Sequence, residues 1–273
     1  MPELPEVETT RRGIAPFIEG QTIARVVVRQ SKLRWPIPED LNQQIAACKI
    51  ISVARRAKYL LIHLEHGVVM VHLGMSGSLR VFEADAVPEA GKHDHVDLLL
   101  QNGTVLRYHD PRRFGAWLWF SGAIETHSLI SKLGPEPLED DFNAQYLQAA
   151  LSTQKRALKL ALMDNHVVVG VGNIYASEVL FLARIAPDKP ANQVSKAQAK
   201  RLHEAIPQVL GKAIELGGST LRDFVHVDGY AGAFQAQANV YGRAGEPCHQ
   251  CGRAIEMLKQ GQRSTYYCRR CQK

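Results

Sequence analysis

The sequence of 273 residues lacks any apolar run near the roughly 18 residues that a membrane-spanning helix requires. Its opening segment, Met1-Pro-Glu-Leu-Pro-Glu6, is acidic and proline-rich, the opposite of a basic and apolar secretory signal. We therefore expect a cytoplasmic protein. Cysteine is also scarce, with five residues, four of them paired near the C-terminus. In a reducing cytoplasm such pairs favour metal binding over disulfides, and the lone Cys48 is expected to be a small buried side chain.

Negative charge is in deficit. The 33 Lys and Arg residues exceed the 27 Asp and Glu residues, which gives a net charge of +6 and an isoelectric point near 9.1. This balance favours a polyanionic partner, although many basic proteins bind no nucleic acid. From Cys248 onward there are six cations against one acid, Glu256. The C-terminal segment is therefore the basic part of the chain.

The first half of the chain is rich in segments typical of strands, in which Val, Ile, Leu and aromatic residues stand between glycine breaks. These segments are 22–29, 50–64, 68–73, 78–82, 96–100, 104–108 and 116–120. Asn102-Gly103 is a strong hairpin signal, and Pro5 suits the first turn of a short preceding helix. We predict a mostly β domain that forms a two-layer sandwich or a barrel.

The composition then changes. Residues 133–142 are proline-rich and acidic, as in a linker, and beyond them the apolar residues recur with a helical period. The candidate helices are 154–164, 173–184, 195–216 and 220–226. Ser195 and Gln198 are placed for a capping box, and Gly217-Gly218 is expected to end the long helix. The second half is therefore predicted to be helical up to the cysteine pairs.

Four cysteines form two pairs near the C-terminus. They are Cys248, Cys251, Cys268 and Cys271. The CxxC spacing, with sixteen residues between the pairs, is typical of a zinc site, because two tight turns can complete a tetrahedron of thiolates. All four positions are filled by protein, so the zinc is expected to be structural. Lys259 and Arg263 lie between the pairs and are candidates for phosphate contacts, although a merely solvated hairpin would have the same composition.

The second residue, Pro2, is a candidate nucleophile, because removal of Met1 would leave it with a free secondary amine. Its secondary amine would attack an aldehyde-like carbon and form an iminium, which makes a neighbouring C–H acidic. Glu3 is adjacent and Glu6 lies one helical turn on, so carboxylates for proton transfer are at hand. On the residues alone, an ordinary start residue remains the alternative.

The N-terminal block Met1-Pro-Glu-Leu-Pro-Glu-Val-Glu-Thr-Thr-Arg-Arg-Gly closely resembles the N-terminus of the bacterial formamidopyrimidine-DNA glycosylase family. Seven further blocks follow in the family's order, namely Arg55-Arg-Ala-Lys58-Tyr, His72-Leu-Gly-Met75, Lys92-His93-Asp-His-Val-Asp, Asp110-Pro-Arg112-Arg-Phe114-Gly, Leu162-Met-Asp-Asn, Gly170-Val-Gly-Asn173-Ile-Tyr and the cysteine segment. The resemblance spans nearly the whole chain, and an ordered series of blocks is far more specific than any single one.

The resemblance implies a bifunctional DNA glycosylase and lyase that excises oxidised purines, such as 8-oxoguanine and formamidopyrimidines, from duplex DNA. Pro2 would attack C1′ of the damaged nucleotide and form a Schiff base, while Glu3 moves protons to the sugar and the departing base. Lys58, interpreted as the end of a strand, would serve the phosphate and β-elimination. Arg263 would reach the phosphate and assist δ-elimination.

The resemblance also implies which residues enter the base stack and which contact the DNA backbone. The residues that would fill the gap left by the extruded nucleotide are Met75, Arg112 and Phe114. Without the resemblance, the Met and the Phe would be interpreted as core residues, although both stand near glycines at expected loop tips. Contacts to the DNA backbone are implied for His93, Lys155, Lys159 and Asn173. Residues 225–234 correspond to the segment that closes over the flipped base.

The implied architecture is α+β. It comprises a two-layer β-sandwich with flanking helices over residues 1–131, a linker over 132–144, a helix–two-turn–helix domain over 145–238 and a zinc ribbon over 239–273. The implied cofactor is one structural Zn²⁺, with no organic cofactor. The implied partner is damaged double-stranded DNA, bound by a monomer in the bacterial cytoplasm and associated with the nucleoid through that DNA.

Two alternatives stay open at this point. Endonuclease VIII, the related enzyme for oxidised pyrimidines, shares the catalytic proline, the two-turn element and the ribbon; Leu4-Pro5 and the three gap-filling residues favour the purine branch. A non-catalytic zinc-ribbon DNA-binding protein would need the basic ribbon but would have no use for Pro2 beside Glu3. The intact mass separates this binder from the enzyme, because the enzyme must lack Met1.

Overall fold

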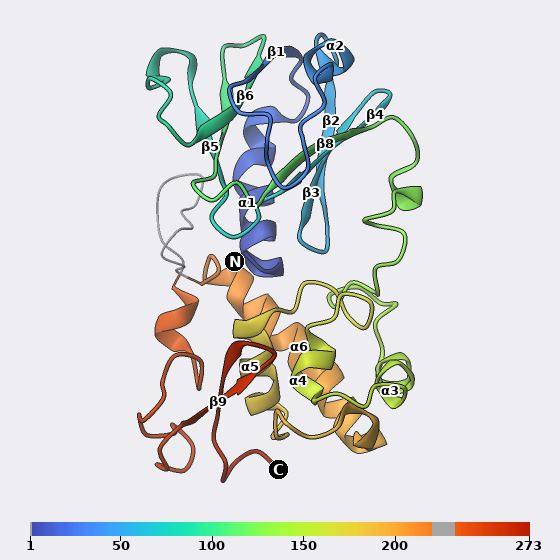
Figure 1. The fold of residues 1–273 in the computed structure, drawn as a ribbon, viewed down its shortest axis with the longest axis vertical. Helices are drawn as coiled ribbons and strands as arrows, with labels where there is room; N and C mark the ends of the chain where they lie inside the picture. The colour runs from blue at the N-terminus through green and yellow to red at the C-terminus, as the bar shows by residue number, and fades with distance from the viewer. Residues whose placement is uncertain (1, 220–232) are drawn as a thin grey trace. The chain divides into compact units, whose positions relative to one another are not determined.

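The computed structural model describes residues 2–219 and 233–273 (Figure 1). Two compact units make up the chain: unit 1 is residues 1–131 with 217–232, and unit 2 is residues 132–216 with 233–273. The predicted helix 220–226, and the predicted closing segment 225–234 up to residue 232, lie outside the described residues.

Within the described part of unit 1, eight strands form two antiparallel sheets. One sheet has the order β1-β6-β7-β5 and the other the order β2-β3-β4-β8. The strands are β1 (Ile23–Val28), β2 (Ile50–Arg56), β3 (Tyr59–Leu64), β4 (Gly67–His72), β5 (Ser78–Phe82), β6 (Asp94–Leu100), β7 (Val105–His109) and β8 (Ala116–Phe120), accompanied by α2 (Leu41–Ile45) and the 3-10 turns η1 (Ala84–Ala86) and η2 (Ile124–Thr126). Both sheets bury residues in one apolar core, among them Leu98 and Leu60. The predicted two-layer sandwich is confirmed.

The helix predicted near Pro5 is α1 (Leu4–Ile18), which is longer than the short helix expected. Glu3 is its N-cap, and Pro5 lies in the first turn, where a helix does not need the N–H that proline lacks. Val7 and Ile14 are fully buried and pack into the core of the sandwich. The residues that precede α1 are therefore held at a fixed place on unit 1.

Residues 50–64 form a hairpin, so the single strand predicted there is wrong. β2 ends at Arg56 and β3 begins at Tyr59, and these two residues pair across the strands. Ala57 makes the turn with a φ of +54°, a conformation that residues other than glycine rarely adopt. The sequence at this turn contains no glycine, proline or asparagine from which the turn could be predicted. Lys58 therefore lies in a turn and not at the end of a strand.

The hairpin predicted at Asn102-Gly103 is confirmed. Gly103 has a φ of +87°, and the Asn102 side chain accepts a hydrogen bond from the N–H of Thr104 at 3.0 Å. β6 and β7 pair antiparallel on either side of the turn. The remaining strand predictions coincide with β1, β4, β5 and β8 to within two residues.

Unit 2 is helical up to the cysteine pairs. Its helices are α3 (Ala144–Ser152), α4 (Leu158–Leu162), α5 (Asn173–Leu182) and α6 (Lys196–Glu215), with 3-10 turns η3 (Ala191–Gln193) and η4 (Phe234–Gln237). The capping box of α6 is confirmed, since the Ser195 hydroxyl accepts from the N–H of Gln198 at 3.2 Å and the Gln198 side chain accepts from the N–H of Ser195 at 3.0 Å. Gly217 follows α6 with a φ of +74°, as expected for a helix-ending glycine.

Before α5 one helix was not predicted and one prediction is too long. α3 was not predicted, although Asn143 caps it by accepting a hydrogen bond from the N–H of Tyr146 at 2.9 Å. The predicted helix 154–164 is reduced to α4. Ala157 is extended, with a ψ of 138°, and forms a β-bridge with Pro190, so helical geometry begins only at the next residue.

The cysteine segment contains β9 (Glu256–Gln260) and β10 (Arg263–Tyr267), which pair antiparallel. A small core joins this hairpin to the helices of the same unit, because Phe181 of α5 packs with Val240, Ile255 and the buried cysteines. This contact places the ribbon on α5 (Figure 1).

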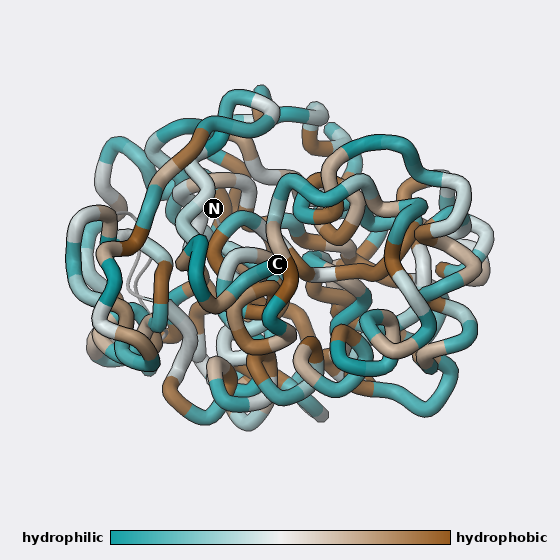
Figure 2. Tube along the Cα trace, turned by 90° about the horizontal axis from the view of Figure 1, so that it is seen from below, coloured by the Kyte–Doolittle hydropathy of each residue, from teal (hydrophilic) through white to brown (hydrophobic). Residues whose placement is uncertain are grey.

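Apolar and polar residues alternate over short distances along the chain (Figure 2). Among the helices of residues 2–219 and 233–273, none combines the length and the hydropathy that crossing a membrane requires.

Candidate active site and metal centre

Pro2 and Glu3 lie at the start of α1, and both are buried. The backbone N–H of Glu3 donates to Oε2 of Glu6 at 2.8 Å. The other oxygen of that carboxylate, Oε1, accepts from the N–H of Ser219 at 2.8 Å. Glu6 is itself fully buried, so these bonds form away from water. Glu6 thus fixes the backbone beside Pro2.

Lys58 is buried in the turn between β2 and β3, with a relative exposure of 7%. Its charge acts on His72 at the end of β4. Burial lowers the pKa of His72 to about 4, and the positive charges of Lys58 and Arg34 add to this effect. Nδ1 of His72 accepts from the N–H of Gly74 at 3.0 Å. The ring is therefore neutral near pH 7, and its Nε2 carries the proton as a hydrogen-bond donor.

A groove of about 760 Å³ opens on unit 1 beside this histidine. It is lined by Lys32, Leu33, Arg34, His72, Gly74, Met75, Arg112, Arg113 and Phe114. Four of these side chains are cations and none is a carboxylate. The groove therefore brings together the three predicted gap-filling residues and suits a polyanion.

The predicted gap-filling residues come from two loops. Met75 lies between β4 and β5 and is half-buried, while Arg112 and Phe114 lie between β7 and β8 and are exposed. Phe114 is 44% exposed, which is unusual for so large an apolar side chain. The Arg112 guanidinium lies 4.9 Å from the centre of the Phe114 ring. The alternative that Phe114 belongs to the core is wrong.

The predicted backbone contacts differ in exposure. His93 is half-buried on unit 1, and Lys155 is exposed on unit 2. Lys159, in contrast, is fully buried, and its ammonium donates to Oδ1 of Asn173 at 2.6 Å. Lys159 also donates to the carbonyl oxygen of Ser264 at 3.2 Å and to Oγ1 of Thr265 at 2.9 Å. These bonds tie α4 to α5 and β10.

Asn173 completes this network at the first turn of α5. Its Nδ2 donates to the carbonyl oxygen of Ser264 at 3.1 Å and to the hydroxyl of Tyr241 at 3.3 Å. Arg263 immediately precedes the network on β10 and is exposed. The orientation of the ribbon tip is therefore set by α4 and α5.

Glu178 is a residue that supports the ribbon and that the sequence analysis missed. It is buried on α5, and its carboxylate accepts from the backbone N–H groups of Asn239, Val240 and Tyr241 at 2.8 to 2.9 Å. Three backbone donors on one carboxylate hold the segment that leads into the ribbon. The only signal in the sequence is a lone acid in an otherwise apolar helix.

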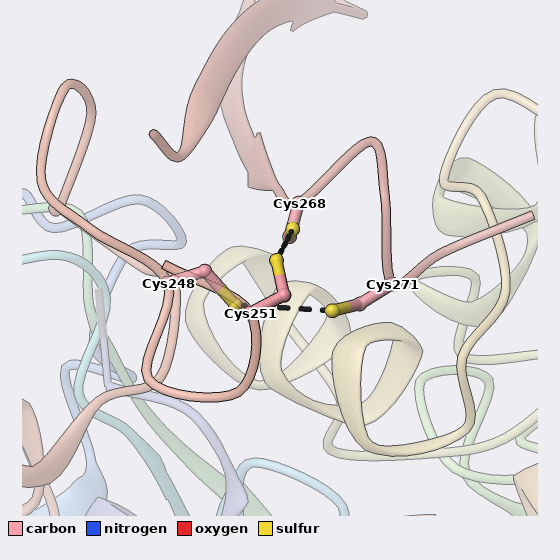
Figure 3. Close-up of side chains that lie close together, drawn as sticks. All are labelled: Cys248, Cys251, Cys268 and Cys271. Atoms are coloured by element: carbon pink, nitrogen blue, oxygen red, sulfur yellow. Dashed lines mark hydrogen bonds between the residues drawn. The ribbon is translucent and has the colours of Figure 1, made fainter. Parts of the chain in front are cut away.

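The four cysteines meet at one point of unit 2 (Figure 3). Their sulfur atoms all lie within 4.8 Å of one another, with Cys248 and Cys271 3.9 Å apart and Cys251 and Cys268 3.5 Å apart. A tetrahedral zinc with Zn–S bonds of about 2.3 Å places its sulfurs about 3.8 Å apart. The donor set therefore fits one structural Zn²⁺ in a closed four-cysteine site.

Comparison with known protein families finds three matching segments of the chain. Residues 1–117 match the formamidopyrimidine-DNA glycosylase N-terminal domain, residues 133–225 match the H2TH domain of the same enzyme, and residues 245–273 match a zinc finger found in FPG and IleRS. The formamidopyrimidine-DNA glycosylase of Neisseria meningitidis is 55% identical over 275 residues, and that of Escherichia coli O7:K1 is 54% identical over 273 residues; each match covers 100% of both chains.

Solved structures agree with the sequence relatives. The MutM (FPG) protein of Thermus thermophilus matches with a TM-score of 0.89 and 40% identity, covering 99% of this chain and 98% of that one. A Lactococcus lactis FPG mutant in complex with DNA containing Fapy-dG matches with a TM-score of 0.91 and 36% identity over 100% of both chains.

The sandwich, the helical unit and the four-cysteine site together define a DNA-repair glycosylase that carries a zinc finger. The chain belongs to the formamidopyrimidine-DNA glycosylase family. The predicted family, the α+β fold and the structural zinc are confirmed.

Proposed function

We propose that the protein excises oxidised purines, such as 8-oxoguanine and formamidopyrimidines, from double-stranded DNA and then cuts the strand by β- and δ-elimination. The observation that carries the proposal is the Pro2–Glu3 terminus, held at the start of α1 in a chain that matches the glycosylase family over its full length. Damaged double-stranded DNA is the partner, and the relatives crystallised with abasic-site and Fapy-dG DNA support this assignment.

The first step belongs to Pro2 after removal of Met1. The secondary amine attacks C1′ of the damaged nucleotide, the bond from C1′ to the base breaks, and the base leaves with a proton from Glu3. The positive end of α1 disfavours a protonated amine at this place, which keeps the nitrogen lone pair available for attack. The new C–N ammonium returns its proton to the Glu3 carboxylate, the C1′–O4′ bond breaks, and O4′ takes that proton from Glu3. The product is an iminium between Pro2 and the opened sugar.

The two eliminations follow from the iminium, which withdraws electrons from C2′ and makes its proton acidic. Loss of that proton expels the 3′ phosphate, and a second elimination expels the 5′ phosphate. Lys58 is assigned to the phosphate that leaves in the β-elimination. Its buried ammonium lies beside the neutral ring of His72, and a buried positive charge favours an anionic ligand, which supports this assignment. Arg263 is assigned to the δ-elimination, which its exposure at the ribbon tip supports.

Met75, Arg112 and Phe114 are assigned to the gap that a flipped nucleotide leaves in the stack. The assignment is supported by the exposure of Phe114 and by the shared groove that the three side chains line. An apolar wedge and a guanidinium are the types that unstack and bond bases in other DNA-bending proteins. We refer to the loops 73–77 and 110–115 as the wedge loops.

Contacts to the DNA backbone are assigned to His93, Lys155 and Asn173. Lys155 is exposed, His93 is partly exposed, and Asn173 is partly exposed at the start of α5. Lys159 is assigned to the same interface through Asn173, because its ammonium is buried and orients that amide. Residues 225–234 are assigned to closure over the flipped base.

The proposed domain division is the sandwich over 1–131, the linker over 132–144, the helical domain over 145–238 and the ribbon over 239–273. One chain carries the whole set of assigned residues, which supports action as a monomer. A cytoplasmic location is proposed because the DNA substrate lies there.

Three duplexes test the proposal: one with a single 8-oxoguanine, one with an oxidised pyrimidine at the same position, and one undamaged. We expect cleavage of the purine lesion with phosphate left at both ends of the gap, as β,δ-elimination requires. Preferred cleavage of the pyrimidine lesion would support an enzyme like endonuclease VIII instead. Binding without cleavage of any duplex would support the non-catalytic ribbon protein.

A further inference from the structure

Asp110 is a completely buried carboxylate at the root of one wedge loop, where it directly follows β7. Its Oδ1 accepts from the Ser76 hydroxyl at 2.7 Å and from the N–H of Arg112 at 3.3 Å. Its Oδ2 accepts from the Tyr108 hydroxyl at 3.0 Å and from the N–H of Gly115 at 2.9 Å. One side chain therefore joins both wedge loops.

Ser76 adds a second hydrogen bond between the two wedge loops. Its hydroxyl donates to Asp110 and also accepts from the N–H of Arg112 at 3.2 Å. Ser76 is fully buried and immediately follows Met75 in the sequence. The position of the Met75 loop is thereby tied to the backbone of Arg112.

The backbones of the two loops also touch. A Cβ atom added to Gly74 would overlap the main chain of Phe114, and one added to Gly115 would overlap the Tyr108 hydroxyl. Arg113 has a φ of +56°, a strained conformation outside glycine, and its N–H donates to the carbonyl oxygen of Asp110 at 3.2 Å. The surroundings thus hold the Arg112–Phe114 segment in a conformation that it would not keep alone.

The main chain of Asp110 also forms hydrogen bonds with residues at the start of β6. Its N–H donates to the carbonyl oxygen of His93 at 3.0 Å, and its carbonyl oxygen accepts from Nε2 of His95 at 2.8 Å. Asp110 is therefore anchored to the sheet at the same point where it organises the loops.

We propose that Asp110 is the positioning residue of the wedge, which holds Met75, Arg112 and Phe114 in the arrangement that enters the base stack. The inference rests on the proposed function of these three residues. Preorganisation is the physical reason, since loops already ordered before binding lose less conformational entropy on insertion into DNA. Asp110 does not touch the DNA in this role.

Asp110→Asn is the sharpest variant. Each carboxylate oxygen faces a backbone N–H, from Arg112 on one side and from Gly115 on the other. An amide group therefore sets its NH₂ against a backbone donor in either orientation, and a buried donor without an acceptor is costly. Ser76→Ala is the milder variant, because it removes only the link between the loops.

Two substrates separate wedge positioning from general loss of structure. The first is duplex DNA with the lesion opposite cytosine or adenine, which requires the wedge. The second is a preformed abasic site in a single strand, which requires neither base flipping nor an opposite base. Asp97→Asn is the matched control, since Asp97 is a similarly buried carboxylate of the same sheet that bonds Arg107 and Arg29, outside the wedge loops.

We expect Asp110→Asn to lower duplex excision on the order of ten- to a hundredfold and to reduce the preference for cytosine over adenine, with single-strand cleavage nearly unchanged. Ser76→Ala should shift the same two quantities less, and Asp97→Asn should lower thermal stability without changing the preference. Equal losses on both substrates, or a wild-type preference in folded Asp110→Asn, would overturn the inference. If Asp110→Asn does not fold, Ser76→Ala decides by the same readouts. A wild-type protein that cleaves neither substrate refutes the proposed function itself, which is a separate result.

Discussion

Arg112 and Phe114 form a stacked pair at the tip of a loop. Their separation of 4.9 Å from guanidinium to ring centre is within the range of a cation–π contact. The pair is exposed, so the contact is made at the cost of leaving an aromatic side chain in water. The ring is the type of side chain that unstacks bases, and the guanidinium is the type that donates hydrogen bonds to a base, in keeping with the roles proposed for them.

Arg112→Ala should therefore relax the preference for the base opposite the lesion. A bidentate contact to a base contributes about 1–3 kcal/mol of discrimination, so the ratio of excision rates opposite cytosine and adenine should fall by about 5- to 160-fold. Arg113→Ala is the control, because it removes a neighbouring cation that lines the same groove and leaves both members of the Arg112–Phe114 pair in place. An unchanged ratio in Arg112→Ala would contradict the assigned role.

His72 makes stability depend on pH. Its pKa is about 4 in the folded protein, mainly because of burial, against an ordinary value of 6.5. Between pH 6.5 and about 4 the unfolded chain takes up a proton that the folded chain does not, so the free energy of unfolding falls as the pH falls through this window. The loss at pH 4 amounts to at most about 3 kcal/mol.

His72→Gln should flatten the pH dependence of stability in that window, as measured by urea unfolding from pH 7 to pH 4. His63→Gln, on β3, removes an imidazole that does not line the groove and serves as the control. A pH profile of His72→Gln that parallels the wild type would show that His72 is not the group responsible.

Single residues differ in how far their place could be predicted from the sequence. On the residues alone Phe114 would be a core side chain, although Gly115 beside it favours a loop tip, and only the resemblance to the family indicated its exposure. The burial of Lys159 was not predictable, because its acceptors lie 14, 105 and 106 positions away and only the folded chain assembles them. The same holds for Asp110, whose partner Ser76 is 34 positions away.

At the scale of elements, the ribbon depends on zinc and on α5 together. The core shared by the ribbon and α5 consists of three apolar side chains and the cysteines themselves. The bonds from Lys159 and Asn173 to β10 also orient this hairpin, and metal binding adds folding free energy to it. We therefore expect loss of the metal site to weaken the order of the ribbon tip with Lys259 and Arg263.

Cys268→Ser should abolish zinc binding and weaken DNA binding. If both ribbon cations lose their phosphates, the slope of log affinity against log salt should become less steep by about 2. Cys48→Ser is the matched control, since Cys48 is a buried cysteine of unit 1, far from the cluster in sequence. Metal content by native mass spectrometry and affinity by fluorescence anisotropy measure both effects. A zinc-free variant with wild-type affinity and salt slope would refute the coupling.

Elements were predictable where their signals are local. The Asn102-Gly103 hairpin and the Ser195 capping box are encoded by adjacent residues, and both were predicted. The turn at Ala57 is imposed by the sheet on a residue with no turn preference. The late start of α4 follows from the bridge between Ala157 and Pro190, a contact between distant residues that sequence periodicity does not reveal.

At the scale of the whole molecule, the net charge of +6 favours a polyanionic partner. Four lysine or arginine side chains are proposed to contact phosphates: Lys58, Lys155 and Arg263 in the proposed function, and Lys259 as the second cation of the ribbon. Each neutralised phosphate contributes about −0.9 to the slope of log affinity against log salt. A rise from about 50 to about 200 mM salt should therefore lower the affinity for undamaged duplex about a hundredfold, as titration by anisotropy would show. An affinity that barely changes would contradict a phosphate-based interface.

The central claim is that the amine of Pro2 performs the chemistry, and borohydride trapping tests it most directly. The protein is mixed with a duplex that holds one 8-oxoguanine, reduced with borohydride, digested and mapped by mass spectrometry. The account predicts a covalent adduct on Pro2, in a chain that has lost Met1. An adduct on a lysine such as Lys58, or no adduct from protein that binds both zinc and the duplex, would contradict it.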